Sequence, residues 1–507
     1  MLHASLSADA VTPLSPVHRR TFGSFVEHMG RCVHTGVYEP DHPTADADGF
    51  RGDVAALVRE LGVTTVRYPG GNFVSGHRWE DGVGPKDRRP VRRDLAWHAI
   101  ETNQFGLDEF VTWCRRSDIE PMMAVNLGTR GLQEALDLLE YANHPGGTHL
   151  SDLRAAHGHP DPHDIRMWCL GNEMDGPWQI GHLDARSYGR KAAQVARAMR
   201  MADRDLELVV CGSSNSSMPT FGTWEATVLE EAYDAVDHIS LHAYYEEHEG
   251  DLAGFLGSVT DMDRFIDSVI STADAVGARL RERKRIQLSF DEWNVWYMSR
   301  HHAQAAARPT DDWPVAPRVI EDRYNVADAV VVGNMLISLL RHSDRVTAAC
   351  QAQLVNVIAP IMTEPGGPAW RQTTFHPFAL TAASAAGHVL HTDVDCPVQD
   401  TARYGEVPVV DAALTHDPED GRAALFVVNR STERPLTLRA DLRDLAPEGV
   451  SEALTLTDDD VYATNTMDDP DRIVPRPNTT VRLDGGRLTV TLPPVSWTVL
   501  TLSTSRN

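Results

Sequence analysis

Two glutamates stand at the ends of apolar segments that have the composition of buried strands. Glu173 ends the segment 165–173, Ile-Arg-Met-Trp-Cys-Leu-Gly-Asn-Glu, and Glu292 ends the segment 286–292, Ile-Gln-Leu-Ser-Phe-Asp-Glu. Two carboxylates that face one cleft can hydrolyse a glycosidic bond, because one donates a proton while the other attacks the sugar or activates water. A single glutamate of this kind would be read as a solvated loop residue. Two of them, each with Asn and Trp neighbours, favour a catalytic pair.

The length and charge of the chain narrow the classes of protein. A chain of 507 residues exceeds one ordinary hydrophobic core, so two domains are expected. With 42 % hydrophobic and 23 % charged residues it is typical of a soluble globular protein. The net charge of −25 argues against a nucleic-acid partner, because phosphate binding needs a basic surface. A neutral sugar substrate is compatible with this charge.

The sequence also predicts a cytoplasmic location. Residues 1–20 contain no apolar stretch of the length found in a signal peptide, and no run of the chain is long enough to cross a membrane. The six cysteines form no CxxC pair, and most stand in apolar segments, as buried free thiols do. A reducing compartment is therefore the expected one, with no membrane partner.

Short apolar segments alternate with helical patterns over residues 21–378. The expected strands are 22–27, 64–68, 122–126, 166–170, 208–211, 238–242, 286–290 and 346–354, and the expected helices include 50–61, 107–117, 131–141, 187–202 and 325–342. Eight such strands predict a (β/α)₈ TIM barrel, whose strands are buried on both faces and therefore continuously apolar. Residues 379–507 change to β-rich runs separated by turns, which predicts a C-terminal antiparallel β-sandwich of jelly-roll type. Residues 1–20 contain one strand that is expected to join this sandwich.

The active site of a TIM barrel lies at the carboxyl ends of its strands, and polar or aromatic residues stand at almost every predicted strand end. These residues are Glu27, Arg67, Asn72, Asn126, Asn172, Glu173, His242, Tyr244, Glu292, Trp296, Gln353 and Asn356, with Trp178 shortly after Glu173. Arg67 can pair with Glu292 and keep it ionised, although a purely structural ion pair is the alternative. Tyr244 can donate a hydrogen bond to the nucleophile, and Asn172 can donate to the sugar hydroxyl beside the anomeric carbon.

The remaining candidates would surround the sugar. Glu27 and Asn72 can bind its outer hydroxyls, and Trp178 and Trp296 can form apolar walls against its faces. For both tryptophans, plain packing is the alternative interpretation. His242 is a further candidate for the pocket, with a satisfied core histidine as the alternative.

Other motifs are less informative. Segment 157–163, His-Gly-His-Pro-Asp-Pro-His, resembles a metal cluster, but it precedes a strand and its spacing matches no standard zinc site, so we expect a surface loop. The Pro-Gly-Gly turn at 69–71 lacks a phosphate-loop pattern, and we find no GxSxG nucleophile elbow. We expect neither a metal nor an organic cofactor.

Several segments together resemble the family 51 glycoside hydrolases, the intracellular α-L-arabinofuranosidases. They are 23–30 (GSFVEHMG), 67–73 (RYPGGNF), 168–179 (WCLGNEMDGPWQ), 291–297 (DEWNVWY) and 352–358 (AQLVNVI), and the likeness extends over nearly the whole chain. The resemblance implies that Glu173 is the acid/base and Glu292 the nucleophile. It also implies that Arg67 supports Glu292, and that a pocket for a terminal arabinofuranose is lined by Glu27, Asn72, Asn172, Tyr244 and Gln353.

Members of this family are commonly hexamers, in which a loop after the second strand approaches a neighbouring subunit's site. In this sequence the corresponding stretch would be 92–105, which contains Trp97. The resemblance therefore implies a homo-oligomer. A second long loop, 303–317, is expected to fold over the site.

The expected activity is that of a retaining exo-α-L-arabinofuranosidase acting on arabinose-containing oligosaccharides. Glu173 would enter the reaction protonated and Glu292 ionised. The alternatives are another retaining barrel glycosidase, such as an endo-glucanase or β-xylosidase, and a non-catalytic sugar-binding protein. Strand alternation places Gln351 and Gln353 on the same face, and the family motif favours Gln353 in the pocket.

Overall fold

Eight parallel strands close into a barrel in the computed structural model, which describes residues 1–306 and 311–506. Around the barrel their order is β10 (Gln287–Val295), β11 (Val346–Ala352), β2 (Gly23–Phe25), β3 (Thr65–Tyr68), β6 (Glu120–Ala124), β7 (Met167–Leu170), β8 (Glu207–Val210) and β9 (His238–Tyr245). Every predicted barrel strand overlaps one of them. Strands such as β3 and β7 are buried at every residue, as the continuous apolar runs predicted.

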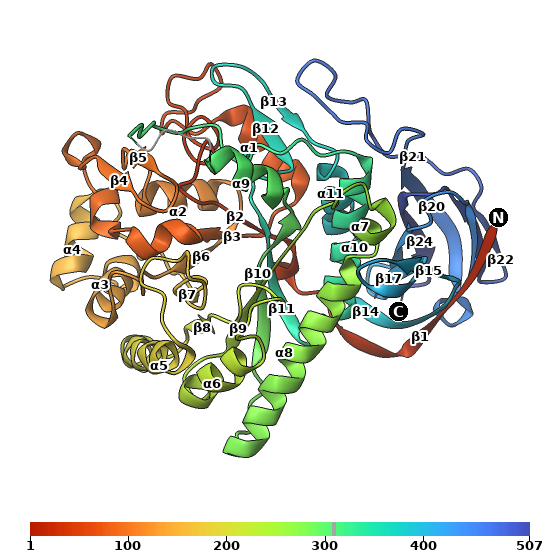
Figure 1. Ribbon diagram of the computed structural model, residues 1–507, viewed down its shortest axis with the longest axis horizontal. Coiled ribbons are helices and arrows are strands. Elements are labelled where there is room, and N and C mark those ends of the chain that lie inside the picture. The colour runs from red at the N-terminus through yellow and green to blue at the C-terminus, as the bar shows by residue number, and fades with distance from the viewer. Residues whose placement is uncertain (307–310, 507) are drawn as a thin grey trace.

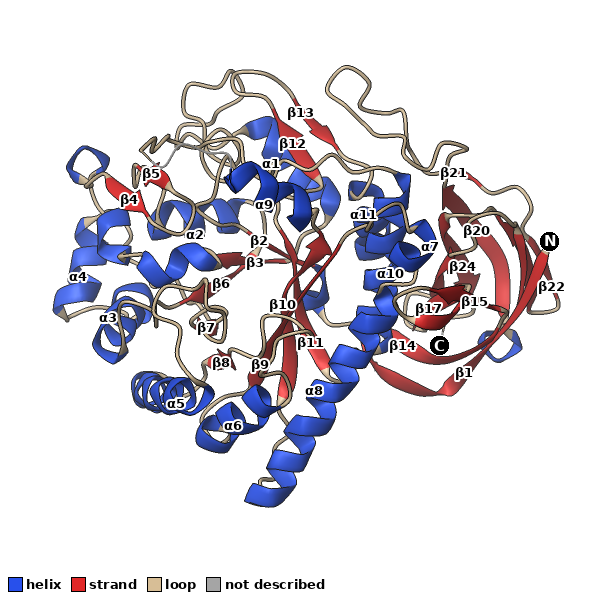
Figure 2. Ribbon diagram, in the orientation of Figure 1, coloured by secondary structure: helices blue, strands red, loops and turns tan. Residues whose placement is uncertain are grey.

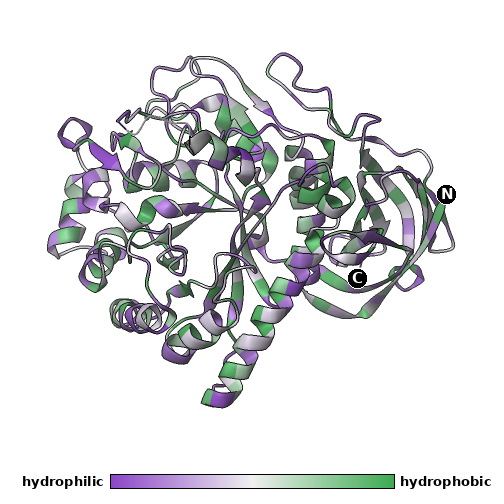
Figure 3. Ribbon diagram, in the orientation of Figure 1, coloured by the Kyte–Doolittle hydropathy of each residue, from purple (hydrophilic) through white to green (hydrophobic). Residues whose placement is uncertain are grey.

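Helices surround the barrel (Figure 1). They are α1 (Gly52–Leu61), α2 (Leu107–Arg116), α3 (Leu132–Asn143), α4 (His149–Ala156), α5 (Ala185–Ala202), α6 (Thr223–Ala232), α7 (Leu252–Leu256), α8 (Val259–Leu280), α9 (Met298–Ala306), α10 (Val326–Arg341) and α11 (Phe375–Ser384). Most present one apolar face to the barrel. Helix α8, for example, buries Met262, Phe265, Val269 and Val276 at helical spacing, and Figure 3 shows hydrophilic residues between such positions. No helix in the described part of the chain is long and apolar enough to span a bilayer.

A second, mostly antiparallel sheet contains the N-terminal strand and the C-terminal strands (Figure 2). Its order is β21 (Arg476–Pro477), β20 (Pro447–Leu456), β24 (Ser496–Thr504), β18 (Arg422–Asn429), β17 (Val410–Asp417), β14 (His388–Asp395), β1 (Leu2–Pro16), β19 (Leu436–Asp441), β23 (Arg487–Leu492) and β22 (Arg482–Asp484). β1 pairs antiparallel with β14 and parallel with β19. Alternate residues of β19, such as Leu436 and Leu438, point into a separate leucine- and valine-rich core. The predicted fold class, a TIM barrel with a C-terminal β-sheet domain, is confirmed.

Helix α10 joins the two sheets. It is buried along almost its whole length because it packs against β10 of the barrel and against β17, β18 and β24 of the second sheet. Asp411 on β17 accepts hydrogen bonds from Asn334 of α10 at 2.7 Å and from Arg430 at 2.9 Å, and pairs with Arg341 at 3.1 Å. Buried charges of opposite sign therefore connect the two parts of the molecule.

Two small hairpins and helix α9 lie at the carboxyl-end rim of the barrel, where the cavity described below opens. Strands β4 (Arg92–Asp94) and β5 (Ala99–Glu101) form a hairpin after β3, and β15 (Val398–Thr401) pairs with β16 (Gly405–Pro408) in a hairpin beside α7. The predicted loop 303–317 is partly wrong, since residues 303–306 belong to α9. Residues 307–310 of that stretch lie outside the described residues.

Candidate active site

One cavity of about 810 Å³ opens at the carboxyl ends of the barrel strands. Its lining includes these predicted residues: Glu27, Asn72, Glu173, Trp178, Tyr244, Glu292, Trp296 and Gln353. Three other predicted residues are bonded to this lining: Arg67 and His242 bind its carboxylates, and Asn172 binds Arg67 and Asn72. The parallel topology accounts for this convergence, because it brings all strand ends to one rim.

Glu292, on β10, is buried and accepts hydrogen bonds from two side chains. Arg67 donates to its Oε1 at 2.8 Å, and the Tyr244 hydroxyl donates to its Oε2 at 2.6 Å. Arg67 Nη2 donates to Asn172 Oδ1 at 2.6 Å, and this second hydrogen bond fixes the orientation of the guanidinium. Burial alone would raise the pKa of Glu292, but His242, Arg67 and Tyr244 lower it below its usual value. Glu292 is therefore an ionised, oriented carboxylate.

Glu173 follows β7 through a sharp turn. Gly171 has a φ of 94°, and Glu173 itself has a φ of 43°, a left-handed conformation that is uncommon outside glycine. The turn brings the Glu173 carboxylate back over the barrel. Its Oε2 accepts a hydrogen bond from the Trp178 indole at 2.6 Å, and its Oε1 pairs with His242 Nδ1 at 2.9 Å. The half-exposed Trp178 thus contacts the carboxylate as well as lining the cavity.

His242 connects the two carboxylates. Its Nδ1 lies 2.9 Å from Glu173 Oε1 and 3.6 Å from Glu292 Oε2. Burial alone would lower the pKa of His242, yet the neighbouring Glu292 and Glu173 raise it above its ordinary value. One oxygen of each carboxylate and this nitrogen all lie within 4.8 Å of one another. His242 is therefore a buried, hydrogen-bonded histidine, as in the alternative interpretation, but its partners are the two candidate catalytic carboxylates.

Glu27 forms the centre of a second polar group in the cavity. Its Oε1 accepts hydrogen bonds from the Phe73 backbone N–H and the Trp97 indole, each at 2.9 Å, and its Oε2 accepts from Gln353 Nε2 at 3.2 Å. Burial raises the pKa of Glu27 to about 8. The Phe73 N–H and the Trp97 indole favour the charged form and oppose this rise only in part.

Only one of the two candidate glutamines reaches the cavity. Gln353 lines it, whereas Gln351 is fully buried and its Nε2 donates to Asn294 at 3.4 Å. The expectation from strand alternation alone, that both share a face, fails because β11 ends at Ala352. The preference for Gln353 agrees with this geometry.

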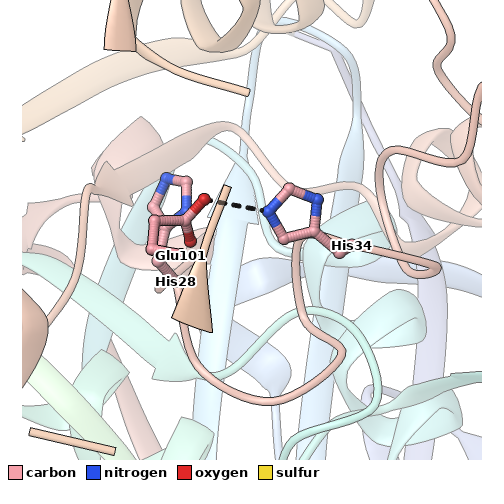
Figure 4. A group of neighbouring side chains, drawn as sticks. All are labelled: His28, His34 and Glu101. Atoms are coloured by element: carbon pink, nitrogen blue, oxygen red, sulfur yellow. Dashed lines mark hydrogen bonds and ion pairs between the residues drawn. The ribbon is translucent and has the colours of Figure 1, made fainter. Parts of the chain in front are cut away.

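The hairpin β4–β5 places Trp97 in the cavity of its own chain. This differs from the expectation that stretch 92–105 would serve a neighbouring subunit, because the Trp97 indole binds Glu27 of the same chain. A group of three residues holds the hairpin from behind (Figure 4). Glu101 Oε2 lies 2.8 Å from His28 Nδ1, and Glu101 Oε1 lies 3.1 Å from His34 Nε2.

This group also favours the charged form of Glu101. Burial would raise its pKa, but His28 and His34 hold the pKa of Glu101 well below its usual range. Among the described residues, this trio and the trio Glu173, His242 and Glu292 are the groups whose spacing could hold a metal ion. In both trios the hydrogen bonds and ion pairs between their own members account for the spacing.

Comparisons with known proteins agree with this geometry. Residues 57–265 match the family model of the α-L-arabinofuranosidase 1 domain, and residues 291–496 match that of the α-L-arabinofuranosidase C-terminal domain. The intracellular exo-α-(1→5)-L-arabinofuranosidase of Streptomyces lividans is 59 % identical over 98 % of this chain and 75 % of its own length. The chain belongs to the family 51 α-L-arabinofuranosidases.

Two further relatives support this assignment. The exo-α-(1→6)-L-arabinofuranosidase of Bifidobacterium longum is 56 % identical over 96 % of this chain and 95 % of its own length. The solved structure of AbfB, a family 51 α-L-arabinofuranosidase from Bifidobacterium longum, superposes with a TM-score of 0.95 at 49 % identity, covering 99 % of this chain and 100 % of that one.

Some polar strand ends of this family 51 enzyme do not face the cavity. Asn126 donates to the His77 carbonyl at 2.8 Å and bonds within its own loop, and Asn356 donates to the Arg31 carbonyl at 2.8 Å. The segment 157–163 is also not a plain surface loop. His163 is buried and pairs with Asp108 at 2.8 Å.

Several residues of the cavity wall were not among those predicted from the sequence. They are Leu95, Ala96, Ser214, Asn215, Ser216, Ser217, Tyr245, Glu246, His248, Asp261, Met298, His301, His302, Arg403 and Tyr404, among others. The run of Ser and Asn at 214–217 follows the predicted fifth strand, and its polarity at that rim was a usable signal. Arg403 and Tyr404 carried no such signal, because they belong to the other sheet domain.

Proposed function

We propose that this chain is a retaining, exo-acting enzyme that removes terminal α-L-arabinofuranosyl residues from arabino-oligosaccharides. The observation that carries the proposal is the close approach of Glu173 and Glu292, whose nearest oxygens lie within 4.8 Å of each other beside one histidine nitrogen. Carboxyl groups in retaining glycosidases lie about 5–5.5 Å apart, against about 6.5–9.5 Å in inverting ones, which must fit a water between them. The short spacing favours direct attack by a carboxylate.

In the proposed reaction Glu173 gives its proton to the leaving glycosidic oxygen while Glu292 Oε attacks the anomeric carbon. The bond to the leaving group breaks and a covalent arabinosyl ester forms. Glu173 then takes a proton from water, which attacks the same carbon, breaks the ester and releases arabinose with its configuration retained. Arg67 and Tyr244 orient Glu292 and stabilise the carboxylate when it leaves again.

The other cavity residues are proposed to bind the terminal sugar. Gln353 Oε1 and Trp296 Nε1 are buried and have no hydrogen-bond partner in the described part of the chain. Buried polar atoms are rarely left unpaired, so hydroxyls of a bound sugar would complete them. Glu27, Asn72 and Asn172 would bind further hydroxyls, and Trp178 would form a wall beside the leaving group. His242 would hold Glu173 and Glu292 in register.

The named relatives differ in the linkage that they cleave. Relatives of similar identity, 59 % and 56 %, carry the names exo-α-(1→5)- and exo-α-(1→6)-L-arabinofuranosidase. We propose arabino-oligosaccharides as the substrate class, and a cytoplasmic location in line with the relatives named intracellular. We also propose a homo-oligomer, a hexamer by family resemblance, which light scattering of the purified chain would test.

A screen of aryl glycosides tests the sugar specificity. Hydrolysis of an aryl α-L-arabinofuranoside, with much slower hydrolysis of aryl β-D-xyloside and β-D-glucoside, is the expected result. Preference for either β-glycoside would favour the alternative of a xylosidase or glucanase. No hydrolysis of any of them would favour a sugar-binding protein.

Two variants test the roles of the carboxylates. Glu292→Ala should lose turnover, and azide should not restore a product of retained configuration. Glu173→Ala should lose about 10²–10⁴-fold on substrates with poor leaving groups, the usual contribution of general acid catalysis, but far less on dinitrophenyl arabinofuranoside. Azide should then rescue Glu173→Ala and give the retained glycosyl azide. Wild-type rates in Glu292→Ala would contradict the assignment.

A further inference from the structure

The cavity that holds the carboxylates extends to the C-terminal domain. Arg403 and Tyr404, at the tip of the hairpin β15–β16, line the same cavity as Glu173 and Glu292. Figure 1 shows β15 on the side of that domain nearest to α7, and the two elements are in contact. The C-terminal domain therefore contributes directly to the wall of the cavity.

The hairpin is fixed against the barrel and its tip is ordered. Val407 of β16 is buried, and a Cβ built on Gly257, just after α7, would lie only 3.2 Å from Val407 Cγ2. At the tip, Thr401 Oγ1 donates to the Gly405 carbonyl at 2.9 Å and accepts from the Tyr404 backbone N–H at 3.1 Å. Such pre-organisation lowers the entropy lost when a ligand binds.

The wall between the catalytic pair and this tip is polar. Ser216 donates to Asp261 at 3.1 Å, and the Tyr245 hydroxyl donates to the same carboxylate at 3.0 Å. All three residues line the cavity. Ser216 lies in the loop after β8, Tyr245 on β9 and Asp261 near the start of α8. Because β8 is the neighbour of β7 in the barrel, this part of the wall lies next to the loop that carries Glu173.

The cavity has more volume than a single arabinofuranose would fill. Pockets of about 300–1,000 Å³ enclose drug-sized ligands, and this cavity measures about 810 Å³. In the proposed function, the group around Glu27, Trp97 and Gln353 binds the terminal arabinofuranose. Ser216, Asp261, Arg403 and Tyr404 line the same cavity and are not part of that group.

We propose that Arg403 and Tyr404, with Ser216 and Asp261, form a subsite for a sugar unit on the leaving-group side of the scissile bond. This inference rests on the proposed function. The Tyr404 ring offers an apolar face to a sugar ring, and Arg403, Ser216 and Asp261 offer donors and an acceptor to its hydroxyls. The ligand is a neutral oligosaccharide that extends beyond the terminal arabinofuranose. Variants of the hairpin tip should therefore lose more activity on longer chains than on an aryl arabinofuranoside.

Kinetics of Tyr404→Ala test the subsite. On a linear α-1,5-arabinotriose, kcat/KM should fall roughly three- to tenfold, the value of one aromatic face contact. On p-nitrophenyl α-L-arabinofuranoside it should fall clearly less, because the aryl group is a single ring without the sugar hydroxyls that the subsite would bind. Tyr404→Phe should keep most of the activity on the trisaccharide. The matched control is Val398→Ala, on the same hairpin but exposed and outside the cavity lining.

Equal effects of Tyr404→Ala on both substrates, or none on either, would overturn the subsite. A binding measurement separates this result from failure of the proposed function. In the inactive Glu292→Gln background, calorimetry should show tighter binding of arabinotriose than of arabinose, and Tyr404→Ala should remove that difference. If the wild type fails to cleave the aryl arabinofuranoside, the function is wrong. If arabinose and arabinotriose bind alike, the subsite is wrong.

Discussion

Replacing Tyr244 with Phe should shift the acid limb of the pH profile to higher pH. The Tyr244 hydroxyl donates to Glu292 Oε2 at 2.6 Å, a short bond to a charged acceptor. The substitution removes only this hydroxyl, because the ring keeps its edge-to-face packing against Trp296 at 5.0 Å. The native bond favours the ionised carboxylate and contributes to the lowered pKa of Glu292.

The size of the shift follows from the strength of that bond. A hydrogen bond to a charged group contributes about 1.5–3 kcal/mol, and one pKa unit corresponds to about 1.4 kcal/mol. The pKa of Glu292 should therefore rise by roughly one unit. This is the lower end of the range that the bond energy allows, because Arg67 and His242 still favour the charged carboxylate. The reaction needs ionised Glu292, so activity at acidic pH is lost earlier in the variant as pH falls.

The assay is kcat/KM of an aryl arabinofuranoside across pH, which reports the ionisation of the free enzyme. Tyr297→Phe is the matched control, because Tyr297 also donates to a buried carboxylate, Asp328 at 2.8 Å, but lies outside the cavity lining. Its acid limb should coincide with that of the wild type. An acid limb in Tyr244→Phe that also coincides would refute the argument that this hydroxyl sets the charge state of Glu292.

Two other predictions concern support of the site and of the fold. Glu101→Gln should loosen the hairpin that carries Trp97, so KM for the arabinofuranoside should rise about tenfold, the equivalent of one charge-assisted hydrogen bond, with a smaller change in kcat. Because the pKa of Glu101 lies below its usual value, its stabilisation is present above that value and lost as pH falls, so melting temperatures of wild type and variant should converge in acid. Asp411→Asn leaves Arg430 without the acid it pairs with and Arg341 with Asp263 alone, and should lower the free energy of unfolding by about 3–5 kcal/mol. Urea unfolding measures this, and an unchanged midpoint would show that the charges are already solvated.

Barrel topology explains why so much of the cavity could be predicted from the sequence. Parallel strands bring their carboxyl ends to one rim, so a polar residue at a strand end is a candidate by position alone. The same rule fails at Asn126, whose side chain accepts from the backbone N–H groups of Gly128 and Thr129 in its own loop. Asn often closes such turns, and composition does not distinguish this use from ligand binding. Local turn geometry, which decides the difference, is set by the neighbouring loops.

Contacts between segments that are far apart in the chain could not be predicted from local sequence patterns. Arg403 and Tyr404 reach the cavity only because α10 docks the second sheet against the barrel and Val407 packs beside Gly257. Nothing in the local sequence of that hairpin specifies this docking. The indole bond from Trp97 to Glu27 likewise depends on the anchoring of β5 by two histidines from another part of the chain.

The two carboxylates of the cavity differ in the side chains that bind them. His242 Nδ1 stands near both, but the Arg67 guanidinium and the Tyr244 hydroxyl bind Glu292 and not Glu173. Glu173 has instead the neutral indole N–H of Trp178. The donors around Glu292 favour its ionised form and outweigh the cost of its burial. We infer that Arg67 and Tyr244, which bind Glu292 and not Glu173, fit Glu292 for the part of the nucleophile.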